Sequence, residues 1–196
     1  LPQSRIPESD RDGVRRHLNR HVDDFDASRE SSSAYPRIVR AIAETPWAIL
    51  PGTLAVIVDL IGLRASGQRL TDEEIQARIG GRQPQRGATT TGAVAVLPLY
   101  GVLIPRATLF GDVSGATSLQ RFTAELRDAL EDSDVSGIVL DVDSPGGMVD
   151  GVPELAAEIR SARGRKPIVA VANTSSNSAA YWLASQADEM VATPSA

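Results

Sequence analysis

The pattern of apolar and polar positions changes along the chain, and its second half alternates strands with helices. Apolar runs typical of buried strands occur at AVAVLPL (93–99), GIVLDV (137–142) and KPIVAVA (166–172). Amphipathic helices are predicted between them, over 117–131 and from Val152 to a stop at Gly164. This alternation predicts an α/β fold with a mainly parallel sheet, whose functional sites lie at the carboxyl ends of the strands.

The first half is organised differently, and three parts are expected there. Residues 1–35 are charged and lack apolar periodicity, which is typical of a disordered tail or a loosely attached helix. Residues 36–81 favour helices, among them TDEEIQARIGG, in which Thr71 and Glu74 can form a capping box. Residues 82–92 are polar and rich in Gly and Thr, which predicts a linker before the α/β domain over 93–196.

One apolar stretch in the helical part, Trp47–Leu63, has the length at which a membrane span becomes conceivable. It contains Pro51 and Asp59, and an unpaired charge inside a bilayer is costly. We therefore expect a packed or interfacial helix rather than a membrane span. The first residues are charged and lack the apolar core of a secretion signal, so export by that route is not expected.

Composition excludes several kinds of chemistry. The formal net charge is −5 with no basic cluster, which argues against a nucleic-acid binder. The chain contains no cysteine, which excludes a disulfide scaffold, thiol catalysis and cysteine-ligated zinc. His17 and His21 have the spacing of a two-histidine metal site, but their charged surroundings favour a solvated helix. No metal or other cofactor is expected.

Two predicted loops follow strands and are chemically suggestive. The first is Asp143-Ser144-Pro145-Gly146-Gly147, in which two glycines leave backbone amides unobstructed toward a ligand oxygen. By itself this pattern favours a plain tight turn. The second is NTSSNSAAYW, where Asn177 or Ser178 can cap the following helix.

Taken together, the loops favour a catalytic interpretation. Ser178 would lie beside helix amides, and the small residues Ala179 and Ala180 would keep its hydroxyl accessible. If the Gly146-Gly147 turn on the neighbouring strand faces the same point, an oxyanion hole lies beside a hydroxyl. This arrangement serves acyl transfer.

Four segments carry a resemblance to a known family: GAVAVLPLYGVL, GIVLDVDSPGGMVDG, KPIVAVAN and SAAYWLASQADEMVATPSA. In this order and at these separations they resemble the signal peptide peptidase A family of serine peptidases, and in particular its phage and prophage branch of head-maturation proteases. The resemblance covers about residues 93–196 and implies a Clp/crotonase-like spiral of ββα units. It makes Ser178 the nucleophile and the amides of Ala179 and of Gly146 or Gly147 the oxyanion donors. An extended substrate would lie along Ser144, Pro145 and Met148.

The base that would activate Ser178 is not evident in the sequence. The resembled peptidases use a Ser-Lys dyad whose lysine follows the serine by some distance, whereas the one lysine here, Lys166, precedes it at the opposite end of its predicted strand. A serine endopeptidase whose dyad lysine lies outside this chain is therefore expected, and the chain alone is expected not to turn over peptides. An inactive head-assembly homologue and a crotonase-like acyl-CoA enzyme remain alternatives.

The resemblance also implies partners and a place of action. A phage scaffold or capsid precursor would be the substrate, a homo-oligomer is expected, and the protein would act in the host cytoplasm or the prohead.

Overall fold

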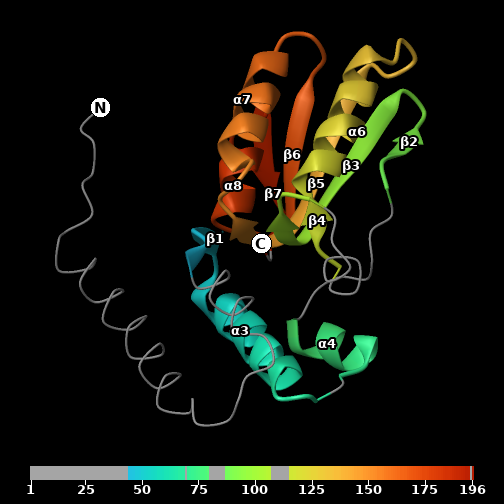
Figure 1. Cartoon of the computed structure of the whole chain (residues 1–196). Helices are drawn as coiled ribbons and strands as arrows, with labels where there is room; N and C mark the ends of the chain where they lie inside the picture. The colour runs from blue at the N-terminus through green and yellow to red at the C-terminus, as the bar shows by residue number, and fades with distance from the viewer. Residues whose placement is uncertain (1–43, 69, 80–86, 107–114, 195) are drawn as a thin grey trace, which may run out of the picture.

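A computed structural model describes residues 44–68, 70–79, 87–106, 115–194 and 196. The described part of the chain forms a seven-stranded sheet with helices against it (Figure 1). The strands are β1 (Trp47–Ile49), β2 (Thr89–Thr91), β3 (Val94–Ile104), β4 (Thr117–Ser118), β5 (Gly137–Met148), β6 (Ile168–Ser176) and β7 (Glu189–Ala192). The helices are α3 (Pro51–Ala65), α4 (Asp72–Ile79), α6 (Leu119–Glu131), α7 (Val152–Ala162) and α8 (Ala179–Ala184).

The sheet is mainly parallel, as the sequence predicts. Its strand order is β2-β3-β5-β6-β7, and β3, β5, β6 and β7 run parallel to one another. β4 adds a short parallel pairing to the end of β3, while β1 and β2 pair antiparallel with β5 and β3. The expected α/β class is confirmed, and the carboxyl ends of β3, β5 and β6 lie at the end of the sheet that faces α3 (Figure 1).

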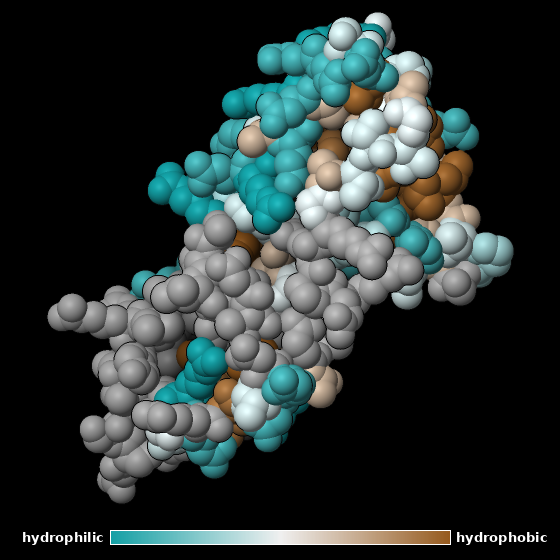
Figure 2. Space-filling view, turned by 90° about the vertical axis from the view of Figure 1, so that its right-hand side faces the viewer, coloured by the Kyte–Doolittle hydropathy of each residue, from teal (hydrophilic) through white to brown (hydrophobic). Residues whose placement is uncertain are grey.

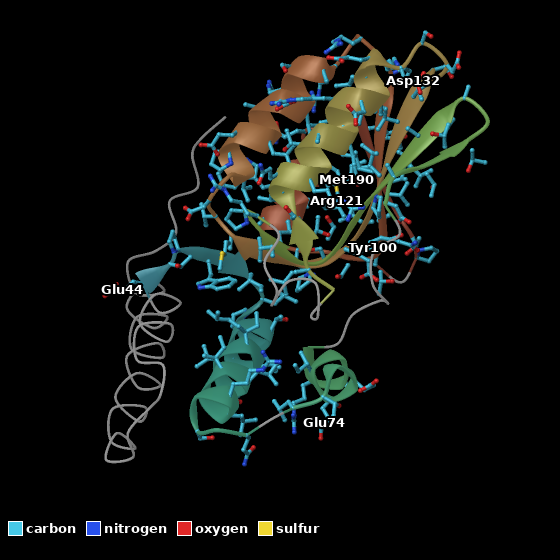
Figure 3. All side chains as sticks on the ribbon, turned by 45° about the vertical axis from the view of Figure 1, so that its right-hand side comes forward. Glu44, Glu74, Tyr100, Arg121, Asp132 and Met190 are labelled. Atoms are coloured by element: carbon cyan, nitrogen blue, oxygen red, sulfur yellow. The ribbon has the colours of Figure 1, made fainter. Side chains whose placement is uncertain are left out.

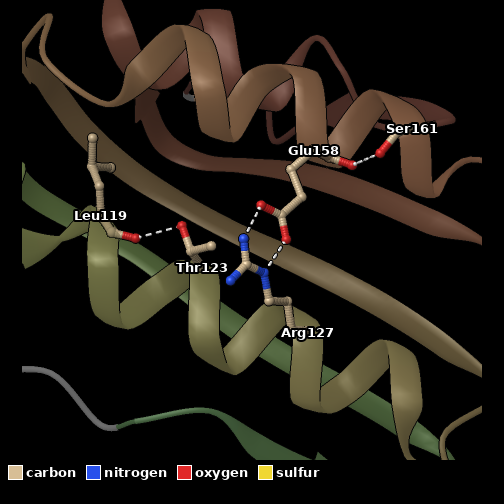
Figure 4. A network of polar contacts seen from close by, with 5 residues as sticks. All are labelled: Leu119, Thr123, Arg127, Glu158 and Ser161. Atoms are coloured by element: carbon tan, nitrogen blue, oxygen red, sulfur yellow. Dashed lines mark hydrogen bonds and ion pairs between the residues drawn. The ribbon is translucent and has the colours of Figure 1, made fainter.

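Helices α6 and α7 lie side by side over one face of the sheet (Figure 1). The predicted apolar face of α6 is buried there: Leu119, Phe122, Leu126 and Leu130 are each at most 6% exposed. On the outer surface, Arg127 of α6 donates two hydrogen bonds to Glu158 of α7, at 2.6 and 2.9 Å (Figure 4). These bonds, with the charge of Glu158, raise the pKa of the Arg127 guanidinium.

The other face of the sheet is partly exposed. Valines that alternate with the core residues of β3, β5 and β6 are half-buried there, and Val191 of β7 is 39% exposed. In Figure 2, hydrophilic residues dominate the described surface, but apolar residues gather in a patch on one side.

The amino-terminal part of the described chain is not wholly helical, which corrects the prediction for 36–81. α3 and α4 are helices, and Thr71 and Glu74 form the expected capping box, with bonds of 2.8 and 3.2 Å. Trp47–Ile49, however, is a strand that pairs with β5. Leu50, the residue before Pro51, has an extended backbone with a ψ of 130°, so α3 begins only at Pro51. Residues 1–43, which include the predicted tail, His17 and His21, lie outside the described residues.

The predicted linker and the predicted strand limits also need adjustment. Residues 82–86 lie outside the described residues, but Thr89–Thr91 pair with β3 as a hairpin strand. β5 runs on to Met148, so the predicted Pro-Gly-Gly turn is part of an irregular strand. Among the described residues, no helix is long and apolar enough to span a membrane.

Candidate active site

Ser178 lies between the end of β6 and the first residue of α8, at the carboxyl edge of the sheet. Its side chain is exposed, and its hydroxyl makes no capping hydrogen bond to the helix. The amides of Ala180 and Tyr181 instead donate to the backbone carbonyl of Asn177, at 2.9 and 3.4 Å. The interpretation of Ser178 as a side-chain cap is therefore not supported by the geometry.

The backbone of Ser178 is strained. Its φ of 53° and ψ of −115° lie in a region that residues other than glycine rarely adopt, and among the described residues it is the single non-glycine with positive φ. Such a conformation costs about 1–3 kcal/mol and persists only where the surroundings impose it. A sharp strand-to-helix turn of this kind is the device that exposes the nucleophile of the α/β-hydrolases.

The Gly146 segment approaches Ser178 closely, so the two predicted loops do meet. Gly146 has a φ of +100°, and a Cβ added there would lie 3.1 Å from the Cβ of Ser178. The two strand ends are joined by a hydrogen bond from the Asn177 amide to the carbonyl of Ser144, at 3.1 Å. The nucleophile candidate and the glycine pair are thus neighbours, as acyl-transfer chemistry requires.

Ser144 lies behind this segment rather than on its surface. It is fully buried; its hydroxyl donates to the Gly101 carbonyl at 2.6 Å and accepts from the Gly146 amide at 3.1 Å. The neighbouring Ser176 hydroxyl is also buried and has no hydrogen-bond partner within the described residues. The buried Ser144 side chain thus holds the Gly146 segment from inside the protein, and its expected contact with substrate stays a prediction.

The predicted oxyanion donors differ in their surroundings. The Gly146 amide is already engaged by Ser144, whereas Ala179 opens α8, where the first amides have no partner within the helix. Gly147 is held between two strands: it pairs with Ala48 of β1 and with Leu103 of β3. A Cβ at Gly147 would lie 2.0 Å from the Leu103 carbonyl oxygen, so only glycine fits.

Lys166 is at the wrong end of the sheet to act on Ser178. Its Nζ donates to the carbonyls of Ala129, at 2.8 Å, and of Asp132, where α6 ends. Figure 3 shows Asp132 at the end of the sheet opposite to Glu44, which leads into β1. The nine residues of β6 separate Lys166 from Ser178 by about 30 Å at roughly 3.3 Å a residue.

Comparisons with known proteins bear on this arrangement. Residues 160–196, which contain β6, Ser178 and α8, match the model of peptidase family S49. The chain is also 36% identical to the capsid assembly protease C of Escherichia phage lambda, over 164 residues that cover 80% of the chain. The chain therefore resembles peptidase family S49, most directly over residues 160–196. The resemblance inferred from the sequence is thereby confirmed.

Two other relatives are a phage head protein and a bacterial protease. The chain is 35% identical over 141 residues to the head-tail preconnector protein GP5 of Enterobacteria phage P21, and 36% identical over 109 residues to Protease 4 of Salmonella typhi. These matches cover 72% and 55% of the chain. The chain spans 28% of the length of GP5, 36% of protease C and 17% of Protease 4.

Among solved structures, the chain is similar to two probable enoyl-CoA hydratases, from Mycobacterium smegmatis and Mycobacterium thermoresistibile. Each covers 54% of the chain, at 16% and 17% identity and TM-scores of 0.37 and 0.31. The alignments span 47% and 48% of those two proteins.

Sequence reasoning missed two features of the site. The strain at Ser178 has no local sequence signal, because serine is common at helix starts. The strand at Trp47–Ile49 did have one: the segment PWAILP is a short apolar run bounded by prolines, and the residue before a proline favours an extended backbone.

Proposed function

We propose that this chain carries the nucleophile and oxyanion site of a serine endopeptidase, with Ser178 attacking the substrate carbonyl. The strained turn at Ser178 is the observation that carries the proposal. It projects an uncapped, exposed hydroxyl at the carboxyl edge of a parallel sheet, where α/β folds place their sites. The match of residues 160–196 to the model of peptidase family S49 supports the same chemistry.

The oxyanion that forms on attack would be bound by backbone amides. The Ala179 amide is the first donor, since it follows the nucleophile at the start of α8. The second donor would be the amide of Gly146 or Gly147; in the structure the Gly146 amide donates to Ser144, and Gly147 pairs with Ala48 of β1. Gly146, Pro145 and Met148 would shape the edge along which an extended substrate lies.

The hydroxyl proton of Ser178 needs an acceptor, and we assign the role of acceptor to a dyad lysine outside this chain. Lys166 cannot serve, because its ammonium is bound to the end of α6. A lysine amine held near the serine would take the proton on attack and return it to the leaving amine. Without that lysine, the hydroxyl is a poor nucleophile near neutral pH.

The names of the phage relatives suggest the substrates. Two relatives are named as a capsid assembly protease and a head-tail preconnector protein. These names favour a phage scaffold or capsid precursor as the protein that is cleaved. We place the reaction in the prohead or the host cytoplasm, and we expect a homo-oligomer that confines proteolysis.

A fluorophosphonate probe applied to a chain extended beyond Ala196 tests the proposal. Labelling of the native sequence and its loss in Ser178→Ala, with labelling retained in Ser185→Ala, would support a serine peptidase. The Ser185 hydroxyl bonds to the carbonyl of Trp182 and has no assigned role in catalysis. Absence of labelling in a folded, extended chain would favour an inactive assembly homologue. Thioester turnover that survives Ser178→Ala would favour an acyl-CoA enzyme.

A further inference from the structure

β1 occupies the edge of β5 at the candidate active site. The two strands pair antiparallel, with Trp47 opposite Met148, Ala48 opposite Gly147 and Ile49 opposite Gly146. Hydrogen bonds close both ends of this pairing: the Leu50 amide donates to Pro145 at 3.0 Å, and the Val149 amide donates to Pro46 at 3.1 Å. The glycine pair is thus covered by a strand of the same chain.

The carbonyl of Ala48 lies close to the position that a side chain at Gly146 would occupy. A Cβ added at Gly146 would lie 2.3 Å from the Ala48 oxygen, 3.1 Å from the Cα of Ile49 and 3.1 Å from the Cβ of Ser178. The Ala48–Ile49 peptide and Ser178 therefore converge on the same point. This is where a serine nucleophile would meet the carbonyl of a peptide that pairs with β5.

The side chains of β1 fix it there in alternation, as in a bound extended peptide. Trp47 and Ile49 pack against a small cluster formed by Ile57, Ile61 and Val102. Ala48 points to the other side and packs against the main core, which includes the first residues of α8. Main-chain pairing binds β1 to β5, and its alternate side chains set the register of the pairing. A peptide that adds a strand to the edge of a sheet binds in the same way.

We propose that residues 46–50 are an internal pseudosubstrate, with Ala48 in the place of the residue whose carbonyl Ser178 attacks. The proposal rests on the assignment of Ser178 as nucleophile. A protein substrate must displace β1 before it can pair with β5, so the segment blocks the strand edge on which a substrate would lie and leaves the Ser178 side chain exposed. The substrate class is an extended apolar segment with a small residue opposite Gly147, flanked by large residues that replace Trp47 and Ile49.

A reversible crosslink tests this directly, because the native chain contains no cysteine that would interfere. Trp47 and Met148 are directly opposed, and directly opposed antiparallel residues have Cα separations of about 4.5–5.5 Å, within the range of a disulfide. The double variant Trp47→Cys/Met148→Cys would lock β1 in place when oxidised and free it when reduced. The probe is a fluorescent peptide with the sequence of residues 45–50, and its binding is measured by anisotropy.

We expect the reduced form to bind the probe at least tenfold more tightly than the oxidised form. Equal affinity in the two forms, or binding to neither, would overturn the proposal. Peptide binding requires no base, so this result can be read in the 196-residue chain even if Ser178 proves not to be a nucleophile. Conversely, labelling of Ser178 by a fluorophosphonate with no effect of the crosslink on binding would reject the pseudosubstrate alone.

A second variant avoids the crosslink. Trp47→Ala/Ile49→Ala removes the anchoring side chains of β1 and leaves β5 unchanged, so the probe should bind at least tenfold more tightly than to the native chain. Ile75→Ala is the matched control: Ile75 is 1% exposed in α4, and its loss should destabilise the helical part without freeing the edge of β5. Equal probe affinity in the double variant and in the native chain would contradict the proposal.

Discussion

Ser144 holds Gly146 in place from inside the protein. Its buried hydroxyl accepts the Gly146 amide at 3.1 Å and donates to the Gly101 carbonyl at 2.6 Å. The backbone carbonyl of Ser144 also accepts a hydrogen bond from the Asn177 amide. Ser144 therefore connects the glycine segment, β3 and the strand that leads to Ser178. A single buried residue thus fixes the relative position of the two halves of the site.

Removing that hydroxyl should be costly. Ser144→Ala leaves a buried amide and a buried carbonyl without their partner, which should lower the free energy of unfolding by about 1–3 kcal/mol. Urea denaturation of the two proteins measures the difference. Ser161→Ala is the control, since Ser161 is exposed and its loss should change stability by no more than about 0.5 kcal/mol. Equal stability of Ser144→Ala and Ser161→Ala would contradict the positioning role.

Two glycines of the same strand should respond oppositely to alanine. A Cβ at Gly147 would meet the Leu103 carbonyl oxygen at 2.0 Å, so Gly147→Ala forces a backbone shift that should cost about 1–3 kcal/mol of stability. At Gly137 the nearest atom would be 3.7 Å away, an ordinary contact. Gly137→Ala should be neutral or stabilise by up to about 1 kcal/mol, because alanine restricts the unfolded chain. Comparable unfolding midpoints for the two variants would be evidence against this packing.

The strain at Ser178 makes a prediction about stability that is independent of catalysis. Its φ and ψ are close to the mirror image of the extended region, which glycine adopts freely. Ser178→Gly should therefore be more stable than Ser178→Ala by about 1 kcal/mol or more, although a glycine inside an ordinary strand or helix usually destabilises. Thermal unfolding of both variants under the same conditions decides it. A less stable glycine variant would show that the turn is not strained.

The βα part of the fold was predictable because each element carries its own signal. The apolar face of α6 and the buried run of β5 follow from periodicity, and the capping box at Thr71 from residue type. The extent of β5 was not predictable. Its continuation through Pro145 and the two glycines depends on pairing with β1 and β3, and these partners are remote in sequence.

The candidate site was predictable in its residues but not in its geometry. The sequence brings Ser178 and the glycine pair to the same sheet edge, since both follow parallel strands. It does not reveal that Ser144 is buried, because a serine beside a Pro-Gly-Gly segment has no sequence signal that distinguishes the inner from the outer side. Nor does it reveal that β1 covers the site, since that depends on tertiary pairing across about a hundred residues.

Lys166 should matter for stability and not for the nucleophile. Its ammonium donates to two carbonyls at the end of α6, so Lys166→Met should lower the free energy of unfolding by about 1–2 kcal/mol. The neighbouring Arg165 is exposed, and Arg165→Met should change the free energy of unfolding by no more than about 0.5 kcal/mol. In a chain extended beyond Ala196, both variants should retain fluorophosphonate labelling of Ser178. Loss of labelling in the folded Lys166 variant would reverse this assignment.

The 196-residue chain alone should not turn over peptides. Ser178 has strain and neighbouring amides in its favour, but a hydroxyl also needs a proton acceptor, and the one lysine of the sequence is bound at the far end of the sheet. A peptide-cleavage assay should therefore give background rates for this chain and for Ser178→Ala alike. Adding the carboxyl-terminal segment that supplies the dyad lysine, in the same chain or as a separate polypeptide, should restore a Ser178-dependent rate, and changing that lysine to alanine should remove it. A Ser178-dependent rate well above background in the 196-residue chain would place the base within it. His17 and His21, from the same chain or from a neighbouring subunit, would then be the candidate bases, and the Ser-Lys assignment would be wrong.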